Sequence, residues 1–161
     1  MRPPAGTVLW RIAKHTPLYK ATDLTGGGAK MTGGRWNSKG VPVVYTSTTI
    51  ALATLETMAH LGDINTRNAF LVKITVPRSV WDRREYVEAQ DFDPTWIAEP
   101  PGSTSIDYGD EWLRSRSAPL LLVPSAIVPE EYNVLVNPVH PISRKISSAV
   151  LRQYIYGPRL G

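Results

Sequence analysis

Residues 41–62, VPVVYTSTTIALATLETMAHLG, decide the fold because they change from a strand pattern to a helix pattern within a few positions. β-Branched and aromatic residues dominate Val41–Thr46, which predicts a strand. Pro42 limits that strand to a sheet edge or to the strand's first positions, because proline lacks the N–H that a central strand donates. The remainder of the segment predicts a helix, so this stretch alone indicates a domain that mixes strands and helices.

The predicted helix carries a carboxylate within its apolar stripe. Ser47 or Thr48 is expected to cap the helix, which runs to about Leu61 and stops at Gly62. Glu56 shares a face with apolar residues three and four positions away. An ionised carboxylate there costs several kcal/mol unless a cation or a ligand compensates it. Glu56 is therefore a candidate functional residue, and the alternative is a glutamate at the margin of the stripe that reaches water or an arginine.

The rest of the chain predicts a strand-rich α+β fold rather than repeated βαβ units, because its helices are few and short. Asp110–Arg116 is expected to form a short helix, and Glu99–Asp107 is turn-rich but too short to separate two domains. Residues 1–161 are therefore expected to form a single domain. The other expected strands are Val8–Ile12, Ala69–Val76 closed by Pro77, Leu120–Val123, Asn133–Val136 and Val150–Tyr156.

Composition excludes several classes of function. The chain has no cysteine, and its three histidines, His15, His60 and His140, are far apart in sequence, so no metal site is expected. No signal peptide and no membrane span is recognisable, which favours a cytoplasmic protein. The net charge of +4 makes an anionic partner plausible, but the scattered basic residues indicate no nucleic-acid-binding arm.

A glycine-rich segment precedes the second candidate residue. Asp23–Gly34 contains five glycines, which predicts an irregular loop whose backbone can approach a ligand closely. Arg35 follows directly, and a guanidinium on such a turn can bind a phosphate with two hydrogen bonds while Trp36 stacks on a ring. A surface arginine paired with a carboxylate explains the pattern equally well. The spacing matches neither a Rossmann motif nor a P-loop.

Other polar residues fit structural roles as readily as functional ones. Tyr45 lies in the predicted strand and is equally consistent with core packing. Ser125 follows a hydrophobic strand and Pro124 without the sequence of a serine hydrolase elbow. Asp110 and Glu111 suit the first turn of a helix, where they complement its dipole. Asn133, Asn137 and His140 lie on or after the strand that follows Ser125, and turns explain most of them.

The order and wording of the motifs resemble the RES-domain toxins of bacterial Xre–RES toxin-antitoxin modules. The resemblance spans nearly the whole chain. It is carried by Leu9–Ala13, Gly33–Ser38, Val43–Ser47, the Ala51–Leu61 helix, Gly109–Leu113, Val123–Ala126 and Asn137–Pro141. One departure is Gly157, which stands before Pro158 where the family pattern has an aspartate.

The resemblance implies a fold similar to ADP-ribosyltransferase toxins and a type II toxin that depletes NAD by cleaving its nicotinamide–ribose bond. It implies Glu56, Arg35 and Tyr45 as catalytic residues. It also implies NAD contacts from Arg35, Trp36, Tyr45 and Ser125. The acceptor, water or inorganic phosphate, stays open, so the enzyme is expected to be an NAD glycohydrolase or phosphorylase with no cofactor besides its substrate.

The resemblance also implies an Xre-type antitoxin that covers the active site, and a homodimer within a larger toxin-antitoxin complex. Two rival functions are kept. The first is a mono-ADP-ribosyltransferase that modifies a macromolecule in the same pocket. The second is a basic RNA- or DNA-binding module without catalysis, which would bind nucleic acid with strong salt dependence.

Overall fold

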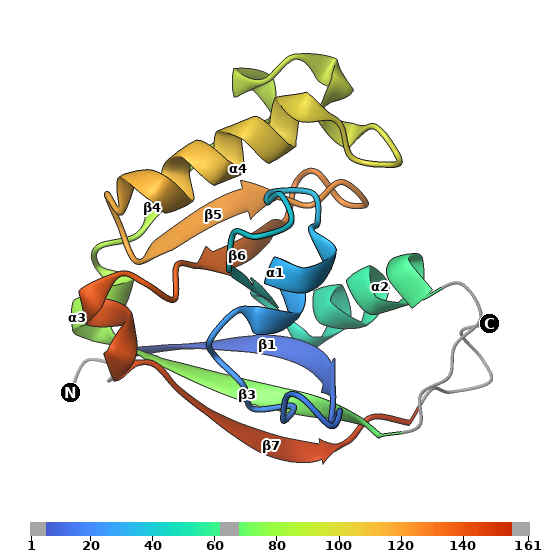
Figure 1. Cartoon of the computed structure of the whole chain (residues 1–161), viewed down its shortest axis with the longest axis vertical. Coiled ribbons are helices and arrows are strands. Elements are labelled where there is room, and N and C mark those ends of the chain that lie inside the picture. The colour runs from blue at the N-terminus through green and yellow to red at the C-terminus, as the bar shows by residue number, and fades with distance from the viewer. Residues whose placement is uncertain (1–5, 62–67, 156–161) are drawn as a thin grey trace.

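The computed structural model describes residues 6–61 and 68–155 and contains one mixed sheet with helices around it (Figure 1). The described strands are β1 (Gly6–Lys14), β2 (Val44–Ser47), β3 (Ala69–Pro77), β4 (Glu85–Tyr86), β5 (Leu120–Pro124), β6 (Tyr132–Val136) and β7 (Ser147–Gln153). The α-helices are α1 (Gly27–Thr32), α2 (Ile50–Leu61), α3 (Arg78–Trp81) and α4 (Ser103–Ser115). Short 3-10 helices are η1 (Ala89–Asp91), η2 (Pro94–Ile97) and η3 (Pro141–Lys145). The expected α+β class is confirmed.

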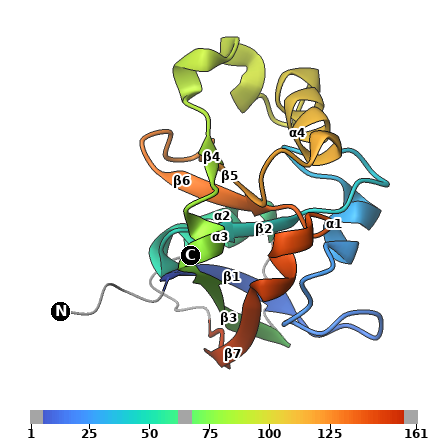
Figure 2. The same cartoon turned by 90° about the vertical axis from the view of Figure 1, so that its left-hand side faces the viewer.

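The seven strands lie in the order β4-β5-β6-β2-β1-β3-β7, and all neighbours are antiparallel except β4 and β5. Pairing is extensive within each half: β1 and β3 pair from Gly6 with Pro77 to Lys14 with Ala69. At the centre, β1 and β2 share only the pair Trp10 with Ser47. The sheet therefore consists of two well-paired halves joined at a narrow seam, which Figure 2 shows from the side.

The two faces of the sheet pack into different hydrophobic cores, and both halves of the sheet reach the first core. One core gathers around Leu9, Val72 and Ile74 and extends to Val44 and Val134 across the seam. The other lies beneath α4 and holds three tryptophans together with Leu121, Val123 and Leu135. Because successive residues of a strand point to opposite faces, β2 and β6 supply side chains to both cores. The seam strands thus tie the two halves together.

The structure adjusts the expectations for residues 41–62. The strand begins at Val44 rather than at Val41, and it is central, between β6 and β1, so Pro42 lies before the strand instead of inside it. The helix is present, but it begins at Ile50, and the hydroxyl of Thr49 accepts the Leu52 N–H at 3.1 Å. The expected caps, Ser47 and Thr48, were therefore wrong. The expected stop at Gly62 lies outside the described residues.

Two segments expected to be irregular are helical. Within Asp23–Gly34, Gly27–Thr32 forms α1, which starts after Gly26 in a left-handed conformation (φ 74°). The close backbone approach expected there occurs against this chain: a Cβ on Gly27 would lie 2.5 Å from the Tyr19 ring. The turn-rich Glu99–Asp107 likewise enters α4 at Ser103, so the helix starts earlier than the expected Asp110.

The remaining expected strands are confirmed with shifted ends. β1, β3, β5 and β6 contain the predicted segments with small extensions. β7 begins at Ser147 instead of Val150, because its first residues already pair with β3. Tyr156 and Gly157 lie outside the described residues. Among the described helices, none is long and apolar enough to cross a membrane.

Candidate active site

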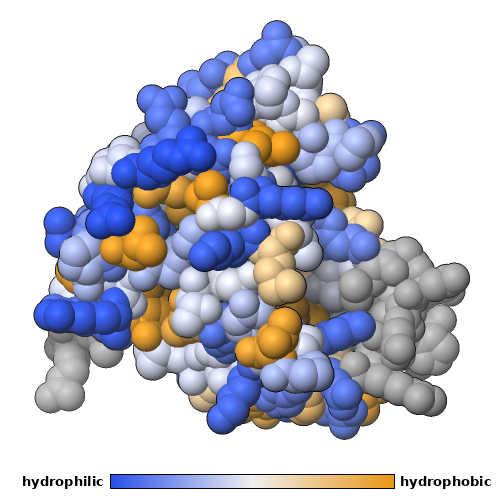
Figure 3. All heavy atoms as spheres, in the orientation of Figure 1, coloured by the Kyte–Doolittle hydropathy of each residue, from blue (hydrophilic) through white to orange (hydrophobic). Residues whose placement is uncertain are grey.

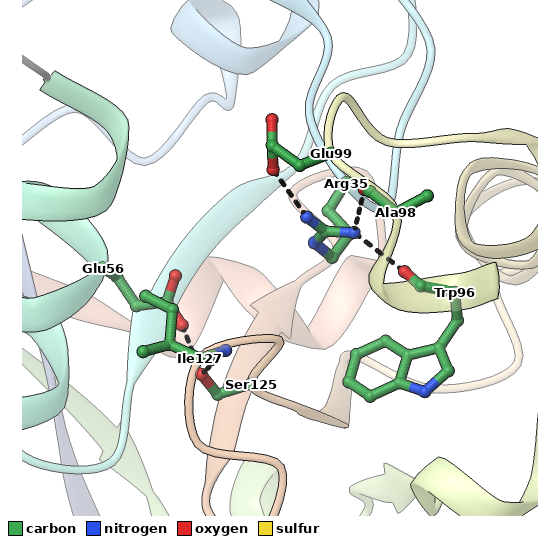
Figure 4. Close-up of polar contacts among 7 residues, drawn as sticks. All are labelled: Arg35, Glu56, Trp96, Ala98, Glu99, Ser125 and Ile127. Carbon is green, nitrogen blue, oxygen red and sulfur yellow. Dashed lines mark hydrogen bonds and ion pairs between the residues drawn. The ribbon is translucent and has the colours of Figure 1, made fainter. Parts of the chain in front are cut away.

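Glu56 is held by two side-chain donors that come from distant parts of the chain. It projects from α2 toward the end of β5, half-buried, and its Oε1 atom accepts a hydrogen bond from the Ser125 hydroxyl at 2.7 Å (Figure 4). The same oxygen accepts the Asn133 amide N–H at 2.7 Å. Among the residues that the structure describes, no donor reaches the Oε2 atom. One carboxylate oxygen is therefore fixed and the other is left to accept a further hydrogen bond.

The two donors to Glu56 are themselves oriented. Ser125 is fully buried, and its hydroxyl accepts the N–H groups of Ile127 and Val128, each at 3.1 Å. With its acceptor lone pairs engaged, the hydroxyl proton is directed to Glu56. Asn133 lies opposite Ser47 in the β2–β6 pairing, and the Ser47 hydroxyl donates to Asn133 Oδ1 at 2.7 Å. This bond sets the amide so that its nitrogen faces Glu56.

Arg35 is engaged mainly by backbone carbonyls. Its Nη1 atom donates to the carbonyl of Trp96 at 2.8 Å and to that of Ala98 at 3.0 Å, and its Nη2 donates to Glu99 Oε2 at 2.9 Å (Figure 4). The Arg35 side chain is 12% exposed and that of Glu99 is 72% exposed. A guanidinium has five N–H donors, so Nε and one hydrogen of Nη2 remain for another acceptor. The contact to the buried Trp96 positions the arginine, and the contacts to Ala98 and Glu99 are exposed.

Tyr45 fixes the turn that carries Arg35. Its hydroxyl accepts the Trp36 N–H at 3.0 Å and donates to Asn37 Oδ1 at 2.6 Å. A Cβ on Gly34 would lie 2.8 Å from the Tyr45 oxygen, so glycine is needed for this approach. Burial, opposed by the hydrogen bond from Trp36, raises the pKa of Tyr45 above its ordinary value, so the phenol stays protonated at neutral pH.

The Trp36 ring lies in the hydrophobic core. It is 3% exposed and packs against Phe92, Trp96 and Tyr108, with ring centroids 5.5 to 6.4 Å apart. This arrangement leaves no open ring face for the expected stacking on nicotinamide or ribose. We therefore leave the Trp36 ring out of the candidate site and keep its backbone N–H, which binds Tyr45.

Helix α4 clamps the other side of the same turn. Asp110 is buried, accepts the Ser38 N–H at 2.8 Å and also binds the Ser38 hydroxyl. A Cβ on Gly109 would lie 1.8 Å from the Trp36 carbonyl oxygen, so only glycine permits this packing. Asp110 is thus structural, as expected, but the expected reason was wrong: it lies deep in α4 instead of in the first turn.

The structure brings the sequence-predicted residues together in two pairs. Glu56 and Ser125 are in contact, and Arg35 and Tyr45 meet through the Gly34–Asn37 turn. Asn133 and Ser47 were missed as site residues. Asn133 had been explained by a turn and Ser47 by a helix cap, and only their pairing across β2 and β6 reveals their common target.

A cavity of about 280 Å³ lies beside the Gly34–Asn37 turn and is lined in part by Gly33, Gly34, Asn37 and Lys39.

Comparison with known proteins places this architecture in a family: the model of the RES domain matches residues 8–154. The chain belongs to the RES family. The expected family is thereby confirmed, and the candidate residues Arg35, Glu56 and Ser125 lie within the matched range.

Curated RES-family relatives match over almost their full length. The chain is 46% identical over 155 residues to a Prs ADP-ribosylating toxin from Sphingobium sp. (strain YBL2), and the match covers 96% of each chain. It is 38% identical to a Toxin Res from Yersinia enterocolitica, covering 95% of this chain and 99% of the relative. A solved structure, the M. tuberculosis MbcT-MbcA toxin-antitoxin complex, is similar in fold, with a TM-score of 0.68 at 15% identity over 92% of this chain and 85% of that one.

Proposed function

We propose that this RES-family chain is a toxin that breaks the nicotinamide–ribose bond of NAD, with Glu56 as the carboxylate at the reacting ribose. The observation that supports this is the hydrogen bonding of the two carboxylate oxygens of Glu56. One of its oxygens is fixed by Ser125 and Asn133, and the other has no donor among residues 6–61 and 68–155. Such an arrangement places negative charge at a defined point before any substrate binds.

The chemistry needs little more than this charge. When the bond between ribose C1′ and the nicotinamide nitrogen breaks, the electron pair goes to the positively charged ring, which leaves as neutral nicotinamide without requiring a proton. Positive charge then develops on the ribose, and a carboxylate beside it lowers the energy of that state. Glu56 Oε2 is placed to accept a ribose hydroxyl or to face the developing charge.

The other site residues position rather than react. The free donors of Arg35, Nε and one hydrogen of Nη2, suit a phosphate oxygen of NAD. Tyr45 holds the turn through Trp36 and Asn37, and Ser125 orients Glu56 instead of contacting the substrate. We thus keep Glu56, Arg35 and Tyr45 in the site. In place of the NAD contact expected of Ser125, we propose a contact from Glu56, which Ser125 orients.

Product identification tests the proposal. Purified protein is incubated with NAD, with and without inorganic phosphate, and the products are identified by mass. Free nicotinamide together with ADP-ribose, or with phosphorylated ADP-ribose when phosphate is present, is the expected result and also identifies the acceptor. Intact NAD after prolonged incubation, with and without a protein acceptor, would refute cleavage by this chain.

A second candidate, transfer of ADP-ribose to a protein, is favoured by the name of the Sphingobium relative, a Prs ADP-ribosylating toxin that is 46% identical. Both reactions break the same bond and differ in the acceptor. Incubation with labelled NAD and the Prs protein of the same cell distinguishes them. Label retained on the protein indicates transfer, and label only in free ADP-ribose indicates hydrolysis.

An antitoxin partner is part of the proposal, because the solved structure with this fold is a toxin-antitoxin complex. We expect an Xre-type protein to cover the face that carries Glu56. Growth arrest on expression of the chain, relieved by the product of an adjacent gene, is the expected result. A protein that relieves the arrest without slowing NAD loss by the purified chain would contradict coverage of the site.

A further inference from the structure

A second cavity, of about 430 Å³, lies between Arg83, which comes shortly after α3, and the 3-10 helix η3. It is lined by Arg83, His140, Pro141, Ile142, Arg144 and Lys145. Its volume falls within the roughly 300–1,000 Å³ that is typical of small-molecule sites. In Figure 1, α3 and η3 lie on one side of the molecule and α2, which carries Glu56, lies on the other, so this cavity is separate from the candidate active site.

The lining is strongly one-sided in charge. Arg83, Arg144 and Lys145 contribute three cations, and no aspartate or glutamate lines the cavity. The nearest acidic residue in sequence, Asp82, pairs with Arg78 at 3.5 Å. Within residues 6–61 and 68–155, no carboxylate lies within 4.0 Å of any of the three cations. Figure 3 shows hydrophilic and hydrophobic atoms mixed over the face of the molecule that it presents.

His140 adds a neutral donor to the same wall. The residue is 8% exposed, and its Nδ1 atom accepts the Ile142 N–H at 3.2 Å, which places the ring proton on Nε2. Burial, followed by the charge of Arg83, lowers the pKa of His140 below its ordinary 6.5, so the ring is neutral at pH 7. His140 is one of the residues that line the cavity.

We propose that this cavity binds the phosphate groups of a small phosphorylated ligand. Two cations from η3 and one from the segment after α3 line the same cavity, which suits an anion that carries more than one negative charge. Pro141 and Ile142 offer apolar contact to the ligand's organic part. The cations surround a hollow instead of following a stripe, which favours a small molecule over a nucleic-acid backbone. The proposal is independent of the chemistry at Glu56.

Calorimetric titration of the full chain with inorganic pyrophosphate tests this site. We expect saturable binding that weakens about tenfold in Arg83→Gln and in Arg144→Gln, because each loses a charge-assisted hydrogen bond. The matched control is Arg114→Gln, which removes an exposed arginine of α4 outside the cavity. Arg35 is itself a candidate phosphate ligand, so Arg35→Lys identifies any pyrophosphate bound at the candidate active site, and the binding that Arg83→Gln weakens should persist in it. Proton NMR of the His140 ring provides a second readout and should shift on addition of pyrophosphate.

Three results would overturn the proposal. The first is absence of binding, and the second is an equal loss in Arg114→Gln, which would indicate a general charge effect. The third is a loss confined to Arg35→Lys, which would locate the ligand at the turn beside Tyr45. Inorganic sulfate and a short DNA duplex are titrated in the same way, for comparison with pyrophosphate. Binding of either one more tightly than pyrophosphate would replace the proposed ligand class, and weaker binding of both supports it.

Discussion

The two ends of the candidate site, around Glu56 and around Arg35, are built in opposite ways. Glu56 is held by side-chain donors, Ser125 and Asn133, and both bonds converge on one oxygen. Arg35 is held by two main-chain carbonyls and one exposed carboxylate. Within the described part of the chain, the glutamate end thus keeps an acceptor atom without a donor, whereas the arginine end already has a carboxylate where an anionic ligand would bind.

The difference shows which end the fold prepares in advance. Ser125 and Asn133 have buried or sheet-bound backbones, so the position of Glu56 is set by β5 and β6. The guanidinium of Arg35 ties the turn at residues 34–37 to η2 through Trp96, and its bonds to Ala98 and Glu99 are exposed. We infer that the carboxylate is ready for chemistry, whereas Glu99 competes with the substrate for the guanidinium of Arg35.

Replacing Glu56 with glutamine should have the largest effect. The glutamine oxygen can still accept from Ser125 and Asn133, so the fold is expected to be kept while the negative charge is lost. We expect NAD turnover to fall by about a thousandfold or more. The measurement is NAD consumption together with thermal unfolding, and Glu111→Gln, an exposed change on α4, is the control. Turnover within tenfold of the parent in a folded Glu56→Gln protein would remove Glu56 from the reaction.

Replacing Asn133 with alanine tests whether the second donor matters. It removes one of the two bonds to Glu56 and leaves the Ser47 hydroxyl without its acceptor. We expect kcat to fall about 10- to 100-fold with little change in KM, because the change affects the placement of the carboxylate rather than NAD binding. Asn133→Asp should be at least as harmful, since it places a second carboxylate against Glu56. A rise in KM with unchanged kcat would indicate direct contact with the substrate.

Part of this site could be predicted from the sequence, and the signal that allowed the prediction differs between residues. Glu56 stood out because a charge within an apolar stripe is costly. The glycines before Arg35 correctly indicated close approach, yet the approaching groups are Tyr19 and Tyr45 of this chain instead of a ligand. The order and type of most strands followed from local patterns, because alternation and β-branched residues are local signals.

Other features depend on pairing between distant strands. Nothing near Asn133 in sequence indicates that it faces Glu56, because the contact spans 77 positions and exists only when β6 pairs with β2. Trp36 looked like a ligand-stacking residue, and its burial follows from aromatic side chains of η2 and α4 that come more than fifty positions later. The early start of α4 was missed because serine and threonine suit a first helical turn as well as a loop.

Replacing Arg35 with lysine tests the arginine end directly. An ammonium cannot bind two carbonyls and a carboxylate in the planar arrangement of a guanidinium. We expect the free energy of unfolding to fall by about 1–3 kcal/mol and the KM for NAD to rise about tenfold. Chemical denaturation and initial rates measure the two effects. Unchanged KM and kcat in this variant would leave Arg35 with a structural role alone.

Replacing Tyr45 with phenylalanine separates support of the turn from chemistry. The change leaves the Trp36 N–H and the side-chain oxygen Oδ1 of Asn37 without their partner. We expect a loss of about 1–3 kcal/mol in unfolding free energy, with a few-fold loss of turnover. Tyr86→Phe, at a residue that is 68% exposed, is the control. A loss of turnover as large as that of Glu56→Gln, with stability unchanged, would instead give the phenol a direct part in the reaction.

Replacing Glu99 with glutamine should have the smallest effect, and it should lower the KM for NAD instead of raising it. Because the Glu99 side chain is 72% exposed, its ion pair with Arg35 contributes only about 0–1 kcal/mol, so stability should hardly change. The two carbonyl bonds from η2 remain and keep the guanidinium in place, while the carboxylate that competes with a phosphate group is gone. We expect the KM for NAD to fall about two- to fivefold with kcat unchanged. Added salt should narrow the gap between parent and variant, because it screens an exposed pair. A higher KM in Glu99→Gln would mean that Glu99 orients Arg35 for the substrate, and the two ends of the site would then both be prepared in advance.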